Sequence, residues 1–182
     1  MSDEYPWYRQ PETFVAVAAL VVSLSAVVVG IYEASLQRAH DRAEVWPHLE
    51  VSTWISDSGA KVVLNNTGLG PAIVRYVSVT VDGQPVRDWK MALAQLYGHY
   101  PPRFSSSTIF QHAVRPGDQS LLIGLSSKDL PPDFYGWAGR ISIRICYSSV
   151  FNEYWMVTGI PGQSDKWEVM RACPAEPSTV DL

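Results

Sequence analysis

An uninterrupted apolar segment near the N-terminus constrains this chain most. The nineteen residues from Phe14 to Tyr32 contain no charge, no proline and a single glycine. As a helix with a rise of ~1.5 Å per residue, they would extend about 28 Å, close to the ~30 Å hydrocarbon core of a bilayer. A segment of this length and composition predicts a transmembrane helix rather than a helix buried in a soluble core.

The flanking segments predict that this span is an uncleaved anchor. The residues before it are acidic rather than basic, the apolar run is longer than the h-region of a signal peptide, and no convincing cleavage site follows it. After it, Glu33–Val45 consists mostly of good helix formers until Pro47 stops the pattern. We therefore predict one helix from about Pro11 to Glu44. The predicted order of segments is a tail (1–12), the span (13–32) and a helical stalk (33–46).

One face of the predicted span carries small residues. They recur at 3-4-3-4 spacing, which lets two membrane helices approach closely. The residues are Ala16, Ala19, Ser23, Ala26 and Gly30. A span rich in valine and alanine also contains such a stripe by chance, so that alternative stays open. The expected partners are the lipid bilayer and other membrane protein subunits, including a second copy of this chain.

After residue 47 the hydrophobic pattern changes from helical spacing to two-residue alternation. Turn signals such as Asp82-Gly83 separate the alternating segments. The segments predicted as strands are residues 48–56, 60–66, 72–81, 84–89, 107–114, 119–125, 140–149 and 153–159. One helix is predicted at Lys90–Tyr97 and one long loop at Ser126–Gly139. The absence of βαβ alternation predicts a mainly β fold, an antiparallel sandwich over residues 47–160 followed by a tail over residues 161–182.

A glycine-rich turn between two predicted strands carries a family resemblance. The turn contains Asn66, Gly68, Gly70 and Pro71, and it is followed by VSVTVDGQPV and later by VRPGDQSLLI. These segments resemble the adhesion-type immunoglobulin-like β-sandwich modules of bacterial envelope proteins. Together with one span, they are similar to bacterial single-span membrane proteins. The resemblance implies an immunoglobulin-like fold and an interaction role, and it implies no catalytic residues.

The same turn also has a structural interpretation that does not need the family. Gly68 and Gly70 are expected to adopt positive φ where the chain leaves one sheet for the next. The Asn66 side chain is expected to hydrogen-bond nearby backbone groups. A phosphate cradle would need a helix after the glycines, whereas a strand is predicted there. We therefore interpret the motif as a structural turn.

Composition and motifs argue against several classes of function. The chain has 14 Lys and Arg against 18 Asp and Glu, a net charge of −4, and no basic cluster suited to nucleic acid. The four histidines are scattered and predict no metal site. Common catalytic and nucleotide-binding motifs are absent, so we expect no cofactor and no enzyme activity. A catalytic triad assembled by the fold would leave no such local signature.

Aromatic side chains accompany prolines and glycines in two predicted loops. Tyr100 lies in one loop, and Phe134, Tyr135 and Trp137 lie in the other. Such rings cap the end of a β core, form a protein interface, or stack against a sugar or another small ligand. All three alternatives stay open at this point, with core capping the most common in a small β domain.

The two cysteines, Cys146 and Cys173, bear on the side of the membrane. They either form one disulfide that ties the tail to a strand or remain as two thiols, depending on the compartment. The basic residues near the span, Arg9 before it and Arg38 and Arg42 after it, do not decide its orientation. The disulfide alternative and the envelope resemblance favour a bacterial inner-membrane protein whose β domain is periplasmic.

These features together predict a single-pass membrane protein with a non-catalytic role. The helix would anchor the chain, and the β-sandwich would mediate protein–protein interaction as an accessory or structural subunit of an envelope membrane complex. The alternative is a membrane-anchored sensor that binds a glycan or small ligand through the aromatic loops.

Overall fold

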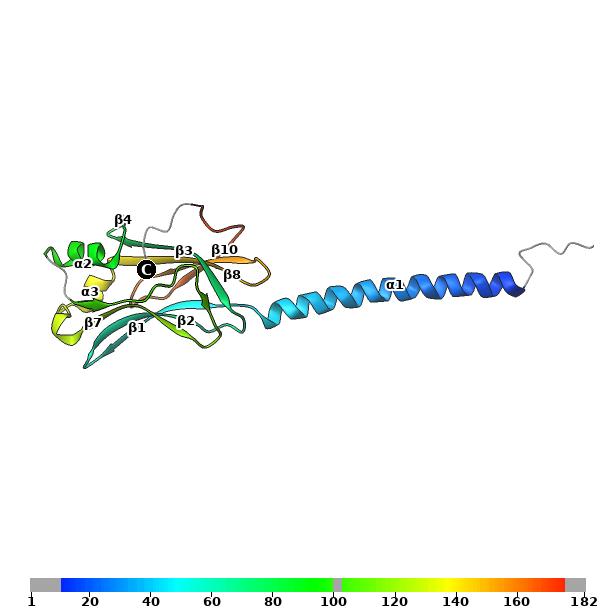
Figure 1. Ribbon diagram of the computed structural model, residues 1–182, viewed down its shortest axis with the longest axis horizontal. Helices are drawn as coiled ribbons and strands as arrows, with labels where there is room; N and C mark the ends of the chain where they lie inside the picture. Colours follow the sequence, from blue (N-terminus) through cyan, green and yellow to red (C-terminus); the bar gives the residue numbers. More distant parts are fainter. Residues whose placement is uncertain (1–10, 100–102, 176–182) are drawn as a thin grey trace, which may run out of the picture. The chain divides into compact units, whose positions relative to one another are not determined.

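The computed structural model describes residues 11–99 and 103–175 of the 182-residue chain (Figure 1). The chain divides into two units, Met1–Ala43 and Glu44–Leu182. The first unit is helical and the second contains all the β-strands of the described residues. Each unit is described below by itself.

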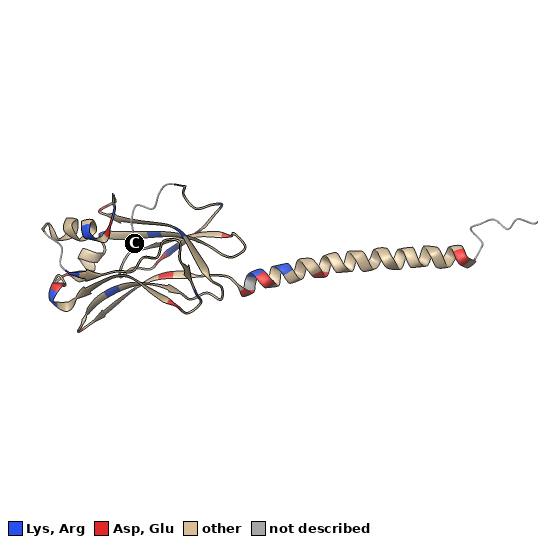
Figure 2. Cartoon of the chain, in the orientation of Figure 1, with Lys and Arg blue, Asp and Glu red and all other residues tan. Residues whose placement is uncertain are grey.

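The first unit is built on one helix, α1 (Pro11–Glu44). Pro11 suits a first helical turn because its missing N–H would have no partner there. Glu12 in the first turn and Arg42 in the last turn complement the helix dipole. Figure 2 shows a long stretch of α1 without charged side chains, followed by a charged C-terminal part. The prediction of one continuous helix, apolar first and polar afterwards, is confirmed.

The second unit, here called the β domain, contains two antiparallel sheets. One has the order β1-β2-β7-β5, and the other has the order β10-β9-β8-β3-β4 with β6 pairing to β3. The strands are β1 Leu49–Ser56, β2 Gly59–Asn66, β3 Ala72–Val81, β4 Gln84–Val86, β5 Phe104–Ser105, β6 Ala113–Val114, β7 Gln119–Ser126, β8 Ile141–Ser148, β9 Tyr154–Gly159 and β10 Lys166–Met170. Inward-facing residues of both sheets share one apolar core. The predicted mainly β fold with two packed antiparallel sheets is confirmed.

The core between the sheets is formed by alternate residues of the long strands. Leu64 on β2, Val77 on β3 and Ile145 on β8 have no exposed surface. Tyr147 on β8 also spans the core, because its hydroxyl oxygen accepts a hydrogen bond from the backbone N–H of Leu49 on β1 at 3.3 Å. Burial raises the pKa of the Tyr147 hydroxyl to about 12, so it stays protonated and neutral at physiological pH.

The predicted helical insert is present as α2 (Trp89–Tyr97). The Asp88 carboxylate caps its start by accepting a hydrogen bond from the Met91 N–H at 2.6 Å. Gly98 ends it in the left-handed region, at φ 68°. The side chains that it buries against the sandwich are Trp89, Ala92, Leu93 and Leu96. Because Asp88 is a helix cap, the strand predicted over residues 84–89 shortens to β4.

The connections between strands differ from the predictions in two places. The strand predicted over residues 107–114 is mostly irregular, and only β6 at its end pairs. The predicted loop Ser126–Gly139 contains a 3-10 turn, η2 (Ser127–Asp129), and a short helix, α3 (Phe134–Ala138). Asp133 caps α3, because its carboxylate accepts the Gly136 N–H at 3.1 Å.

The predicted C-terminal tail contains a strand. β10 pairs with β9 in antiparallel register, with Trp167 opposite Val157. The second sheet therefore continues past residue 160, and the predicted end of the sandwich was too early. Most β10 side chains are exposed. The strand is held mainly by its backbone pairing and by contacts to β1, which hydrophobic alternation does not reveal.

Candidate functional site

The predicted structural turn is organised around the buried amide of Asn66, which is 1% exposed. Its oxygen accepts hydrogen bonds from the backbone N–H groups of Gly68 at 3.0 Å and His48 at 3.2 Å. Its nitrogen donates to the carbonyl oxygens of Gly70 at 2.8 Å and Val114 at 2.9 Å. The amide thereby uses all four of its hydrogen-bonding positions. It joins the start of the β domain, the glycine-rich turn and β6, which is a structural role.

The two glycines of this turn are required for a different reason from the one predicted. Neither Gly68 nor Gly70 is among the residues with positive φ, so that prediction was wrong. A Cβ on Gly68 would collide with the backbone of Trp46 and His48, and a Cβ on Gly70 would collide with the carbonyl of Val45. Pro71 follows them directly and leads into β3. Glycine is needed here because two backbone segments approach closely.

A row of three rings lies where the chain enters the β domain. The imidazole of His48 lies between two indoles, with its centroid 5.1 Å from that of Trp46 and 4.8 Å from that of Trp167. The His48 Nε2 atom is also 3.4 Å from a carboxylate oxygen of Glu50. Sequence reasoning missed this row because Trp167 lies in the segment predicted as a tail.

Two side chains from the C-terminal segment cover the outer edge of β1. The indole N–H of Trp167 donates to the carbonyl of Leu49 at 2.9 Å, and the Asp165 carboxylate accepts the N–H of Val51 at 2.6 Å. Burial raises the pKa of the Asp165 carboxyl, and the nearby charge of Glu50 adds to that rise. These backbone groups are therefore occupied, and this part of β1 cannot pair with another strand.

The predicted aromatic residues do not converge on a ligand site. Phe134 is buried, and Trp137 packs with it against Ala60, with ring centroids 5.9 Å apart. Tyr97 from α2 contacts Trp137 edge-on at 5.3 Å. Tyr135 is 60% exposed, and its ring contacts that of Phe134 edge-on, with the centroids 5.7 Å apart. Phe134 and Trp137 therefore cap the core, the first of the three alternatives, and Tyr100 lies outside the described residues.

The cavity beside these rings is too small for a sugar. It is lined by Ala60, Phe134 and Trp137, among other apolar residues, and it measures about 10 Å³. That volume is at the lower limit for a single water molecule. A larger, open depression of about 470 Å³ lies over β2, β5 and β7, with Lys61 and Arg103 at its margins. Surface lysine and arginine on an open sheet face do not by themselves make a binding site.

The two cysteines form a disulfide, the first of the two predicted alternatives. Cys146 has no exposed surface and lies on the outer side of the second sheet, where it packs with Tyr76 and Met156. Met170 and Cys173 pack against this cluster from the C-terminal segment. The bond therefore fixes the segment after β10 across the outer side of this sheet.

The small-residue stripe of α1 is exposed along its whole length. Ala16, Ala19, Ser23, Ala26 and Gly30 all lie on the surface of the helix. The Ser23 hydroxyl donates to the carbonyl of Ala19 at 2.7 Å, so it is satisfied within the helix. A Cβ on Gly30 would meet no atom of the chain within 4 Å. Nothing in the described residues requires the stripe, and its role in helix pairing stays a prediction.

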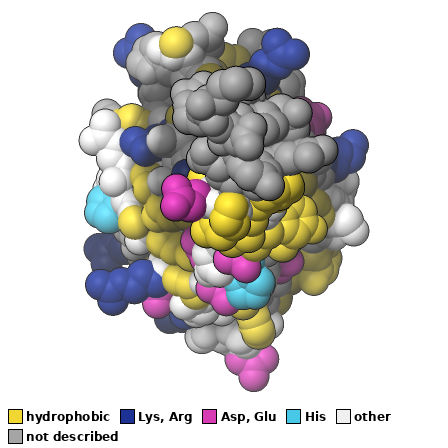
Figure 3. Space-filling model, turned by 90° about the vertical axis from the view of Figure 1, so that its right-hand side faces the viewer, with side chains coloured by type: hydrophobic (Ala, Val, Ile, Leu, Met, Phe, Trp, Pro, Cys, Tyr) yellow, Lys and Arg dark blue, Asp and Glu magenta, His cyan; other side chains and the backbone are white. Residues whose placement is uncertain are grey.

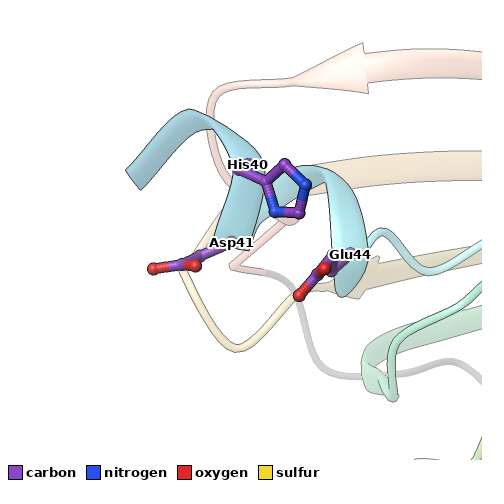
Figure 4. A group of neighbouring side chains, drawn as sticks. All are labelled: His40, Asp41 and Glu44. Carbon is purple, nitrogen blue, oxygen red and sulfur yellow. The ribbon is translucent and has the colours of Figure 1, made fainter. Parts of the chain in front are cut away.

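Sequence reasoning overlooked one group of side chains at the end of α1 that are of the types that bind metal ions. The ligand atoms of His40, Asp41 and Glu44 lie within 4.8 Å of one another (Figure 4). His40 and Glu44 are four residues apart on a helix, and that spacing was visible in the sequence. The Asp41 carboxylate already accepts a hydrogen bond from the Gln37 amide at 2.9 Å. Exposed polar groups of this kind are common on helix ends, and we assign them no metal.

Charged side chains are dispersed over the β domain. Figure 2 shows acidic and basic residues scattered over its strands and loops. Figure 3 draws the whole chain from the right-hand side of Figure 1, and hydrophobic, acidic and basic side chains lie next to one another in that view. The best-defined ion pair links Arg140 and Asp82 at 2.5 Å, and it lowers the pKa of the Asp82 carboxyl through the hydrogen bond from Arg140. This exposed pair joins the start of β8 to the β3–β4 turn.

Comparison with known proteins adds no family to this description. The chain matches no protein-family model, and no curated protein matches it. The resemblance to envelope immunoglobulin-like modules therefore stays a prediction, and so does the bacterial origin that it implies.

Proposed function

We propose that this protein is a single-pass membrane protein whose β domain mediates protein–protein interaction, as a non-catalytic accessory or structural subunit of an envelope membrane complex. One observation carries the proposal. Within the helix over Pro11–Arg42, the most apolar 18-residue window has a mean hydropathy of 2.8, and none of that window is buried inside the chain. A helix that is apolar on all sides needs an apolar environment, and the β domain already has a core of its own.

The length and composition of α1 support a bilayer as that environment. Its charge-free stretch from Phe14 to Tyr32 matches the hydrocarbon thickness, and a helix satisfies its own backbone hydrogen bonds in lipid. Ser23 and Ser25 bond back to carbonyls one turn earlier, as polar residues in a membrane helix do. A signal sequence passes the same test of length and hydropathy, and α1 continues twelve residues beyond Tyr32 as an ordered helix.

The disulfide supports a β domain outside the cytoplasm. Disulfides persist in oxidising compartments such as the periplasm and are rare in the cytosol. Cys146 and Cys173 are both bonded, so the chain holds no free thiol. With the β domain in the periplasm, the short N-terminal segment lies in the cytoplasm of a bacterial inner-membrane protein.

The sensor alternative has no supporting observation in the described aromatic residues. Phe134 and Trp137 are part of the core, and the cavity beside them does not admit a sugar. We therefore propose an interaction role rather than ligand sensing. That the protein is not an enzyme also stays a prediction.

Crosslinking in native membranes tests the interaction role. Membranes are treated with an amine-reactive crosslinker, solubilised in mild detergent and resolved on blue-native gels with and without crosslinker. We expect the chain to migrate in an assembly larger than one copy, and mass spectrometry then distinguishes other subunits from a second copy. Migration only at the mass of one chain in both lanes would contradict the proposal.

A further inference from the structure

Three of the four outer edges of the two sheets carry a feature that hinders pairing with another strand. In the first sheet, β5 contains only two residues, and the edge of β1 is covered at Leu49 and Val51 by the side chains described above. In the second sheet, one edge is formed by the short strands β4 and β6, and β4 contains Pro85. The fourth edge is β10, which is longer than β4, β5 or β6 and contains no proline.

The outer edge of β10 is open in the part of the chain that the structure describes. β9 pairs with β10 on one side, from Lys166 opposite Thr158 to Met170 opposite Tyr154, and no second strand lies beside it. No hydrogen bond from another described segment reaches the backbone of β10 on its other side. Alternate N–H and C=O groups of β10 therefore point outward without a partner among the described residues.

The two faces of β10 carry different side chains. Trp167 faces the first sheet, because its indole donates to the carbonyl of Leu49 on β1. Val169 shares that face and is 83% exposed, so the first sheet does not cover it. Lys166 and Glu168 lie on the opposite face, both exposed, and no described residue forms an ion pair with either. β10 thus has one apolar face and one face with two opposite charges.

An open edge of this kind favours an extended protein segment as its partner. A strand carries N–H and C=O groups at the same spacing as the edge, and proteins bind extended peptides in this way. Every strand pair of the described β domain is antiparallel, and antiparallel pairing is slightly more stable per residue than parallel pairing. Opposite charges across two strands are favourable and like charges are not, so Lys166 and Glu168 restrict which segments fit.

We propose that β10 binds an extended segment of another protein, which adds to the second sheet as an antiparallel strand. The segment has an acidic side chain opposite Lys166, a basic side chain opposite Glu168, and apolar side chains opposite Trp167 and Val169. Main-chain hydrogen bonds provide affinity, and the alternating side chains provide specificity. This inference rests on the interaction role proposed above and assigns that role to one edge of the β domain.

Crosslinking to two synthetic peptides tests this assignment. The peptide Thr-Val-Lys-Val-Glu is complementary to β10 in antiparallel register, with its lysine opposite Glu168 and its glutamate opposite Lys166. The control peptide Thr-Val-Glu-Val-Lys has the same composition and places like charges opposite one another. Both are flanked by glycines and carry the same photoreactive diazirine. Each is added at the same millimolar concentration to the full chain in mild detergent, and mass spectrometry measures the yield and the crosslinked residues.

We expect the complementary peptide to crosslink to β10 at least about fivefold more than the control peptide, because two like-charge pairs are replaced by two opposite-charge pairs. In the double variant Lys166→Glu with Glu168→Lys, the preference should invert, which misfolding would not produce. Lys61→Glu, at an exposed position on β2, is the control and should keep the natural preference. Equal yields, no crosslinking, or an unchanged preference in the double variant would overturn the proposal.

Two further measurements distinguish other occupants of this edge. The first uses a chain that ends at residue 175. A higher yield from this chain than from the full chain would show that residues 176–182 cover β10, and it would overturn the assignment to another protein. The second varies the concentration of the full chain with the peptide in excess. A yield per chain that falls as the chain concentration rises would show that a second copy covers β10, with the same consequence.

Blue-native gels of native membranes separate failure of this inference from failure of the interaction role. We expect the double variant Lys166→Glu with Glu168→Lys to lose the larger assembly that the natural chain forms. The same assembly in both would show that β10 is not the contact, and it would overturn only this inference. Migration of the natural chain at the mass of one copy would overturn the interaction role, and with it this inference.

Discussion

Helix α1 and the β domain place their hydrophobic side chains in opposite environments. Leu20 and Val28 on α1 are 61% and 64% exposed, whereas Val77 and Ile145 in the β domain have no exposed surface. The β domain contains a core shared by two sheets, so its stability lies within the chain. The apolar part of α1 contains no such core, and its stable environment has to come from outside the chain. The same hydrophobic residue types therefore form the folded core of the β domain, whereas in α1 they indicate that the helix needs an apolar environment outside the chain.

The largest expected effect comes from charging the apolar part of α1. Leu20→Arg combined with Val27→Arg costs ~5–7 kcal/mol of membrane insertion, from about 2.5–3.5 kcal/mol for each arginine near the bilayer centre. We expect the double variant to be lost from the membrane fraction after carbonate extraction. Leu36→Arg, in the polar part of α1, is the control and should remain. Full retention of the double variant would mean that the β domain alone holds the protein to the membrane.

A smaller effect is expected on the free energy of unfolding of the β domain, which should respond to a substitution in the sandwich core and not to one on α1. Ile145→Ala empties part of the sandwich core and should lower the free energy of unfolding of the β domain by about 2–5 kcal/mol. Val22→Ala removes methyl groups from an exposed position on α1 and should leave that free energy unchanged. Urea unfolding in mild detergent, followed by tryptophan fluorescence, measures both. An equal loss in the two variants would show that α1 belongs to the core of the β domain.

Within the β domain, the Asn66 amide should matter more than its neighbour. Asn66→Ala leaves the N–H groups of His48 and Gly68 and two carbonyl oxygens without their partner, and we expect a loss of about 2–4 kcal/mol. Asn65→Ala removes a hydrogen bond to the Ser52 hydroxyl and should cost about 1 kcal/mol or less. The same unfolding assay compares them, and a similar cost for both would contradict the structural role given to Asn66.

The smallest expected effect is a change with pH in the stability of the β domain. It comes from Asp165, whose carboxylate covers part of the edge of β1. Because the folded pKa of Asp165 is raised by burial, the folded state binds this proton more tightly than the unfolded state. The ionised Asp165 carboxylate therefore lowers the free energy of unfolding. This loss of stability is absent below the unfolded pKa of about 3.9 and appears as pH rises through the folded pKa. Asp165→Asn keeps an oxygen that can accept the Val51 N–H and does not titrate.

Unfolding curves at several pH values measure this contribution. We expect the stability of Asp165→Asn relative to the natural chain to increase as pH rises from about 4 towards neutrality. Glu168→Gln, at an exposed position on β10, is the control and should show a smaller change. If the difference in stability between Asp165→Asn and the natural chain stayed constant with pH, titration of Asp165 would not contribute to the stability of the β domain.

Local patterns predicted most of this fold. The bounds of α1 follow from Pro11, the helix formers after Tyr32 and Pro47, and the strands from β1 to β3 follow from two-residue alternation ended by turn residues. These signals lie within a few residues of the structure that they specify, so they are visible in one sequence.

Contacts between distant segments were not predictable in the same way. β10 is held to β1 by Trp167, 118 residues from its partner Leu49, and its own hydrophobic pattern is weak. Gly68 and Gly70 are glycines because the backbone of Trp46 and Val45 approaches them, which no turn pattern specifies. The spacing of His40 and Glu44, in contrast, was present in the sequence and was overlooked.

The most direct test of the account is the environment of α1 itself. A nitroxide spin label is placed at Val22→Cys in the apolar part and at Arg38→Cys in the polar part, and each protein is reconstituted in vesicles. Electron paramagnetic resonance then measures the collisions of each label with oxygen, which concentrates in lipid, and with a water-soluble nickel complex. We expect oxygen to dominate at position 22 and the nickel complex at position 38. Nickel collisions as frequent at position 22 as at position 38 would contradict a transmembrane α1.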